Sequence, residues 1–84
     1  MPSESKRHAQ LVALGEAIRD TRIRQGFSAS NIASKAGLRA SQLRELEQGQ
    51  LDPDLDLILR VADAIGVRAS AFVLRAEELE GTEQ

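Results

Sequence analysis

The sequence predicts an all-α protein made of five short helices. Apolar side chains recur at spacings of three and four residues along most of the chain, which is the pattern of helices with one buried face. No segment alternates apolar and polar residues in the way that a half-buried strand does. Glycines that suit helix ends separate the segments. With 84 residues the chain has room for one small core, so we expect a single compact domain.

The first helix is expected to begin near His8 and to end at Gly26, a residue type that commonly follows the last turn of a helix. Its apolar stripe comprises Leu11, Leu14 and Ile18. Residues 1–7 are polar and contain a proline, so they are predicted to form a flexible N-terminal segment.

Two short helices follow, joined by a tight turn. Ser28 is a suitable N-cap for the first of them, because its hydroxyl can accept a hydrogen bond from a backbone N–H one turn into the helix. This helix is expected to end at Gly37, and the next one near Gly49. The residues expected to face inward are Ile32, Ala33, Ala36, Leu43 and Leu46.

Asp54 is predicted to cap a fourth helix that ends at Gly66. The residues expected to face inward from this helix are Leu55, Ile58, Val61, Ala62 and Ile65. A fifth helix is expected over residues 69–74, with a poor cap because Arg68 has no acceptor. The acidic tail, residues 76–84, is expected to extend this helix by about one turn and then to fray.

The second and third helices have the features of a helix-turn-helix, within a domain placed at residues 8–75. Two short helices that cross steeply need a small residue at the crossing, and Ala33 provides it. The turn needs a residue that tolerates a positive φ, which Gly37 does. Leu43 and Leu46, three residues apart, would face the preceding helix. An ordinary antiparallel bundle with the same spacings is the alternative interpretation.

From about residue 14 to 74 the chain resembles the phage-repressor/Cro, or XRE-type, helix-turn-helix family. The resemblance rests on three stretches, LGEAIRDTRIRQGFS, NIASKAGLRASQLRELEQG and PDLDLILRVADAIGV. It implies a compact five-helix repressor-like DNA-binding domain, with the helix-turn-helix formed by helices 2 and 3. It also implies that helix 3 lies in the major groove and that the partner is double-stranded DNA.

The resemblance places the DNA contacts at the start of helices 2 and 3. The candidate residues are Ser28, Ser30, Asn31, Arg39, Ala40, Ser41, Gln42, Arg44 and Glu45. Arg39 suits guanine or a phosphate, Gln42 suits adenine, and Glu45 can accept a hydrogen bond from cytosine N4. Ser41 suits a base or a phosphate, and Arg44 and the start of helix 2 suit backbone phosphates.

The resemblance also implies a structural ion pair between Arg22, late in the first helix, and Glu47, at the end of the third. Such a pair would hold the first helix against the recognition helix. Two unrelated, solvated charges are the alternative interpretation.

Charge argues for weak DNA binding by each protomer. The formal net charge is −2, and residues 11–74 carry eight basic and eight acidic side chains. Asp52 and Asp56 would repel phosphates, and Ala29 replaces a glutamine that many family members use. A homodimer would offset this weakness by placing two recognition helices on one operator. The candidate dimer contact comprises Ala71, Phe72, Val73 and Leu74, with core packing as the alternative.

The leading functional hypothesis is therefore a homodimeric transcriptional regulator. The alternative is a protein-interaction module on the same scaffold, in which the acidic 52–56 segment and the acidic tail contact another protein, as an antitoxin binds its toxin or an accessory factor its polymerase. Lys6, Arg7 and His8 are a weaker candidate for a basic arm that touches phosphate.

Other classes find little support in the sequence. There is no cysteine, and His8 is the only histidine, so no metal site is expected. No phosphate-binding loop, paired-carboxylate site or nucleophile–base pair is visible, so neither an enzyme nor a cofactor is expected. No apolar segment approaches a membrane span or a secretory leader, which predicts a cytoplasmic protein.

Overall fold

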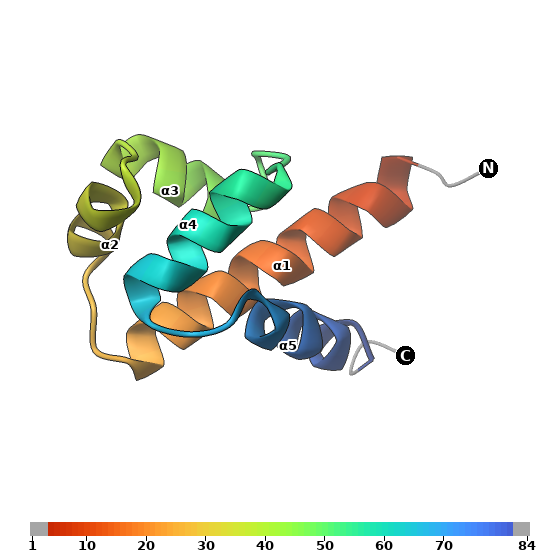
Figure 1. The fold of residues 1–84 in the computed structure, drawn as a ribbon. Helices are drawn as coiled ribbons and strands as arrows, with labels where there is room; N and C mark the ends of the chain where they lie inside the picture. Colours follow the sequence, from red (N-terminus) through yellow and green to blue (C-terminus); the bar gives the residue numbers. More distant parts are fainter. Residues whose placement is uncertain (1–3, 82–84) are drawn as a thin grey trace.

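Five helices make up the computed structural model, which describes residues 4–81 and contains no strand in that range. They are α1 (Glu4–Arg24), α2 (Ala29–Ala36), α3 (Ala40–Glu47), α4 (Leu55–Ile65) and α5 (Ala69–Gly81). Figure 1 shows α2 and α3 at one end of the molecule, with α1 running diagonally and α5 beside it. This arrangement confirms the predicted all-α fold class.

One hydrophobic core joins all five helices. Its largest fully buried side chains are Phe72, Ile18, Ile32, Leu43, Leu46 and Val61. Phe72 anchors α5 in this core, so its place in the candidate dimer contact was wrong, whereas Val73 and Leu74 are exposed. Leu55 was expected to face inward, yet 70% of it is exposed, because the residue lies in the first turn of α4 beyond the edge of the core.

The predicted helix caps are confirmed. Ser28 Oγ accepts a hydrogen bond from the Asn31 N–H at 3.1 Å. Asp54 Oδ1 accepts one from the Leu57 N–H at 2.8 Å. Each cap satisfies a backbone donor that has no partner within its helix, which fixes where α2 and α4 begin.

The two outer helices are longer than the sequence indicated. α1 begins at Glu4, several residues before the expected start at His8, and the Arg7 guanidinium donates to the Asp52 carboxylate in the loop after α3. α5 continues to Gly81, through residues that were expected to be mostly tail. Both extensions are stabilised by contacts with distant segments, which local sequence patterns do not reveal.

The extension of α5 packs on α1 through small side chains. Ala13 and Ala17 of α1 and Ala76 of α5 are buried together, with the partly buried Leu79 beside them. Because alanines let two helix backbones approach closely, α5 lies directly against α1. No helix within residues 4–81 is long and apolar enough to cross a lipid bilayer.

Candidate nucleic-acid interface

The turn between α2 and α3 has the geometry that the sequence predicted. Gly37 follows the last residue of α2 with φ of 75°, in the left-handed region that favours glycine. The Leu38 N–H then donates to Ala33 O at 2.8 Å, which closes the end of α2. Arg39 returns to an extended backbone and serves as the N-cap of α3. Because Ala33 is buried at the crossing, the two helices pack tightly around this turn.

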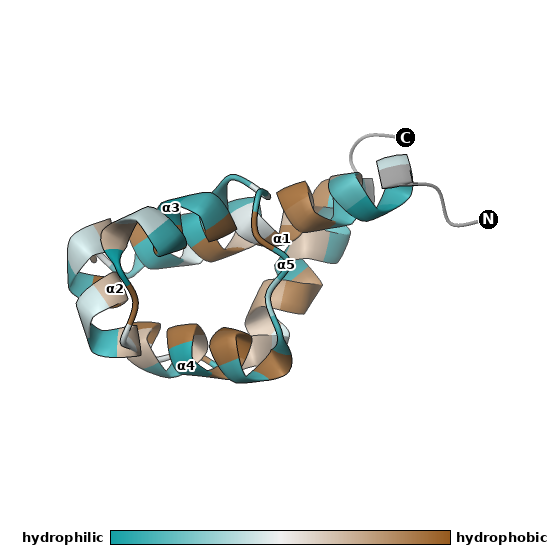
Figure 2. Ribbon diagram, turned by 90° about the horizontal axis from the view of Figure 1, so that it is seen from above, coloured by the Kyte–Doolittle hydropathy of each residue, from teal (hydrophilic) through white to brown (hydrophobic). Residues whose placement is uncertain are grey.

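The polar candidates of α3 lie on its solvent side. Leu43 and Leu46 are buried, whereas Arg39, Ser41, Arg44 and Glu45 are exposed and Ala40 and Gln42 are half-buried. Figure 2 shows that hydrophilic residues cover the outward side of α3, while α4 carries a larger share of apolar ones. The first two turns of α3 therefore present a polar surface of mixed donors and acceptors.

The candidates at the start of α2 form a second group, one helix length from the turn. Ser28, Ser30 and Asn31 are all exposed. α2 has eight residues and is therefore about 12 Å long, close to the width of the DNA major groove.

Arg39 and Gln42 share a hydrogen bond at the start of α3. The Arg39 N–H donates to Gln42 Oε1 at 2.9 Å. This is one half of a capping box, and the other half cannot form because the Arg39 side chain has no acceptor. The guanidinium of Arg39 therefore takes no part in capping α3, whereas Gln42 Oε1 accepts a hydrogen bond from the start of its own helix.

The structure contains the Arg22–Glu47 pair. Arg22 Nε lies 2.7 Å from Glu47 Oε2 and Arg22 Nη2 lies 3.0 Å from Glu47 Oε1, which is the two-pronged geometry that arginine and carboxylate favour. Arg22 Nη1 also donates to Phe27 O at 2.8 Å. Both side chains are at most 10% exposed. α1, the loop before α2 and the end of α3 are therefore held by one guanidinium.

A glycine in the middle of α1, which the motifs of the sequence do not mark as functional, lets α3 approach closely. A Cβ at Gly15 would lie 2.4 Å from Leu46 O and 2.5 Å from Glu47 O. Glycine inside a helix costs about 1 kcal/mol relative to alanine, so its presence there was a signal of such a contact. Together with the Arg22–Glu47 pair, Gly15 fixes the end of α3 on α1.

The three carboxylates of the 52–56 segment have partners within the chain. Asp52 receives the Arg7 guanidinium, Asp54 caps α4, and Asp56 Oδ2 lies 3.1 Å from Arg60 Nε. The acidic segment is therefore less repulsive toward phosphates than its composition suggests. Arg7, predicted as part of a basic arm, is paired with Asp52 in this structure.

Arg60 also links α4 to the helix-turn-helix. Its Nη1 donates to Ala36 O, the carbonyl at the end of α2, at 3.1 Å. This contact satisfies a carbonyl that has no partner within α2. No local pattern in the sequence indicates this role of Arg60, because the contact joins residues 24 positions apart.

Comparison with known proteins places this arrangement in a family. Residues 13–71 match the family model of a helix-turn-helix domain, and the chain belongs to this family of DNA-binding regulators rather than to an enzyme family. A comparison with curated protein sequences found no match.

Solved structures support the same fold. The chain is similar to the clp gene regulator ClgR of Corynebacterium glutamicum, with a TM-score of 0.85 and 24% identity over 88% of this chain and 79% of that one. A second structure of ClgR from C. glutamicum has a TM-score of 0.80 and 26% identity over 82% of this chain and 90% of that one. The restriction-modification controller protein C.AhdI of Aeromonas hydrophila has a TM-score of 0.74 and 31% identity over 76% of this chain and 97% of that one.

Proposed function

We propose that this chain is a sequence-specific transcriptional regulator that binds an operator as a homodimer, with α3 in the major groove. The observation that carries the proposal is the exposed polar opening of α3, held at a fixed orientation by Arg22 and Glu47. By their names, ClgR is a gene regulator and C.AhdI a controller protein, which supports regulation as the role of this fold.

The two groups of polar residues have different roles in binding, one toward base edges and the other toward backbone phosphates. Arg39, Ser41 and Gln42 offer donors to base edges, and Glu45 offers an acceptor. Arg44, together with the start of α2, suits backbone phosphates, which set the register on DNA without reading its sequence. Since each protomer offers few cations, two protomers are needed for a stable complex.

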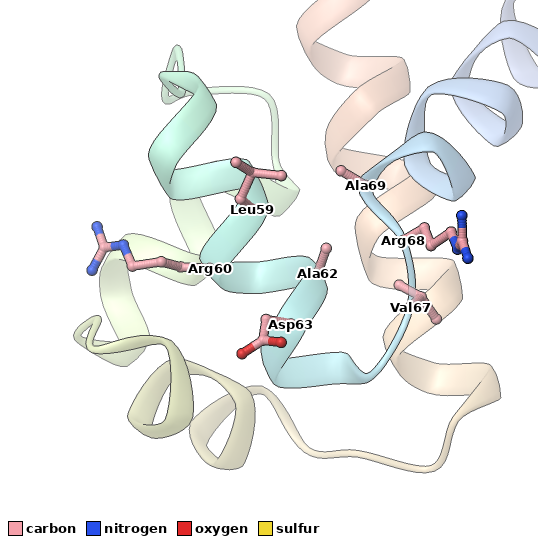
Figure 3. A pocket seen from close by; sticks show the side chains of 7 residues that line it. All are labelled: Leu59, Arg60, Ala62, Asp63, Val67, Arg68 and Ala69. Atoms are coloured by element: carbon pink, nitrogen blue, oxygen red, sulfur yellow. The ribbon is translucent and has the colours of Figure 1, made fainter.

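A groove between α4 and the beginning of α5 supports the homodimer. Its volume is about 580 Å³, and Leu59, Ala62 and Ala69 line the space between the two helices (Figure 3). Val67 and three charged residues, Arg60, Asp63 and Arg68, complete its lining. Four apolar residues of α4 and α5 are each at least half exposed: Leu59, which lines the groove, and Leu55, Val73 and Leu74 elsewhere on the two helices. An apolar surface of this kind on so small a domain marks an interaction site, and we assign it to a second copy.

The alternative of a protein-interaction module uses the acidic 52–56 segment and the acidic tail. The three carboxylates of the segment, Asp52, Asp54 and Asp56, have partners in their own chain. This pairing weakens the part of the alternative that rests on the segment and supports DNA as the partner.

Selection from a randomised duplex pool at near-physiological salt tests the proposal. We expect an enriched, roughly palindromic motif with half-sites about 34 Å apart, one turn of DNA. Arg39→Ala is the control, because it removes the exposed guanidinium and keeps the backbone N–H bonded to Gln42. It should bind the motif at least severalfold more weakly with an unchanged fold. If the parent protein enriches no motif beyond what Arg39→Ala enriches, even at lower salt, the proposal of DNA binding is wrong, and the helix-turn-helix instead serves to bind a protein partner.

A further inference from the structure

Two side chains of opposite charge at the groove between α4 and α5 have no partner in the described part of the chain. Three charged residues line this groove, Arg60, Asp63 and Arg68. Arg60 is already engaged, because it pairs with Asp56 and donates to the carbonyl oxygen of Ala36. Asp63 and Arg68 are exposed, and neither side chain has a hydrogen bond or an ion pair with any residue that the structure describes. One negative and one positive side chain therefore remain unpaired at the groove.

These two side chains lie on opposite sides of the groove. Asp63 belongs to α4, whereas Arg68 is in the segment between α4 and α5. Figure 3 shows the carboxylate of Asp63 beside α4 and the guanidinium of Arg68 pointing away from that helix. The groove thus has a negative charge on its α4 side and a positive charge on its α5 side.

A second copy of the chain complements this arrangement by symmetry. In a two-fold interface both protomers use the same surface, so a residue on one side of the axis meets the residue on the other side from the partner. With the axis at the groove, Asp63 of one protomer faces Arg68 of the partner subunit, and the same contact forms a second time. A charge that enters an apolar interface without a partner weakens binding, whereas complementary charges fix the orientation of the two surfaces.

We propose that Asp63 and Arg68 form this reciprocal ion pair between protomers, and that the pair selects a second copy of this chain and sets its orientation at the groove. The inference rests on the proposed homodimer. A protein of another sequence would have to present both charges in the same arrangement beside an apolar surface that accepts Leu59, which a second copy does without further requirement.

The test uses charge reversal, because its effect in trans separates a contact between protomers from a contact within one. The proteins are the parent, Asp63→Arg, Arg68→Asp, an equal mixture of these two variants, and the variant that carries both changes. Sedimentation velocity over a concentration series gives the dissociation constant of each dimer in the absence of DNA. Circular dichroism checks that the helix content of each variant equals that of the parent.

Two further variants control for the change in net charge. Glu16→Arg and Arg19→Asp make the same reversals at exposed positions of α1, outside the lining of the groove. They alter the total charge of a protomer as much as the variants under test do. We expect both control variants to dimerise as the parent does.

Each single reversal in the groove should raise the dissociation constant of the homodimer by about tenfold or more, because both copies of the pair become repulsive. The mixture should form heterodimers about as tightly as the parent forms homodimers, since an arginine then faces an aspartate at both contacts. The variant with both changes should recover its homodimer for the same reason.

Three outcomes would contradict the inference. Single reversals that dimerise as well as the two α1 controls would show that the charges do not meet, and the homodimer would stand. Weaker dimers that neither mixing nor the second change restores would also exclude a reciprocal pair. A parent protein that stays monomeric at every concentration would overturn the proposed homodimer, and the inference with it.

Discussion

Arg22 shows how much of this fold can depend on one side chain. All three of its guanidinium nitrogens have acceptors, two on Glu47 and one on the Phe27 carbonyl. The Lys35 ammonium lies over the ring of Phe27, 5.1 Å from the ring centroid, in a cation–π contact. Because the carboxylate of Glu47 is nearly buried, its charge is tolerated only with this partner in place.

Arg22→Ala should lower the free energy of unfolding by about 3–5 kcal/mol, the usual cost of leaving one buried charge unpaired. Urea denaturation measures it. Arg24→Ala is the matched control, since Arg24 pairs with Asp20 at 3.1 Å on the surface and should cost no more than about 1 kcal/mol. Equal losses in the two variants would contradict the role given to the buried pair. Arg22→Met combined with Glu47→Leu should recover most of the loss.

Gly15→Ala should also destabilise the domain, although alanine is the better helix former. The added Cβ would press on the backbone carbonyls of Leu46 and Glu47, and overpacking of this kind costs about 1–3 kcal/mol. Gly81→Ala is the control, because Gly81 is also in a helix and has open space around it. Thermal unfolding of both variants checks the prediction, which fails if Gly15→Ala is as stable as the parent.

At the scale of the elements, the sequence predicted the interior helices well and the outer ones poorly. α2 and α4 have side-chain caps and terminal glycines, which are local signals. The first turns of α1 and the last turns of α5 have no such pattern. The start of α1 is held by the ion pair of Arg7 with Asp52. The extension of α5 is held by Arg75, whose Nε lies 3.1 Å from Asp20 Oδ2. Contacts between residues 45 and 55 positions apart cannot be read from spacing.

Arg75 joins the extension of α5 to α1 electrostatically as well. The hydrogen bond that it donates to Glu78, together with one to Asp20, raises the pKa of its guanidinium above the ordinary value. Acidic residues in this part of α5 thus contribute to a helix rather than to a free tail.

Ala17→Leu should separate α5 from α1. Ala17 is fully buried between the helices, and a larger side chain there would cost about 1–3 kcal/mol of unfolding free energy. For a domain of this size, each kcal/mol lowers the midpoint of thermal unfolding by about 4–8 °C. Ala9→Leu, at an exposed position of the same helix, should change the midpoint of thermal unfolding little. Similar midpoints for the two variants would show that the α1–α5 contact is not tight.

At the scale of the whole molecule, residue types indicate which side chains form the candidate site but not how those side chains are oriented. Residue types placed Arg39, Gln42 and Glu45 at the start of the third helix, and in the structure Arg39 and Glu45 are exposed while Gln42 is half-buried. The direction of the Gln42 amide depends on a hydrogen bond, which residue type does not specify. Likewise, the charge of Asp52 suggested repulsion of DNA until Arg7 was found beside it.

Leu59→Glu should abolish dimerisation without unfolding the protein. Leu59 lines the groove and is 50% exposed, so a charge there is tolerated by the monomer and excluded from an apolar interface. Sedimentation velocity should show a monomer, and operator affinity should fall by about 10²–10⁴, the gain that bivalent binding provides. Ile23→Glu, at a similarly exposed position on α1, should stay dimeric. A dimeric Leu59→Glu variant would place the interface elsewhere.

The packing of α5 on α1 also affects when the protein can fold during its synthesis. α1 leaves the ribosome first, but Ala13 and Ala17 cannot be covered until Ala76 and Leu79 have emerged. The same delay applies to the core, which lacks Phe72 until α5 is made. A nascent chain that ends at α4 therefore exposes apolar surface to proteases and chaperones. Because small domains fold as units, we expect this one to become protease-resistant in a single late step, when α5 is free of the ribosome.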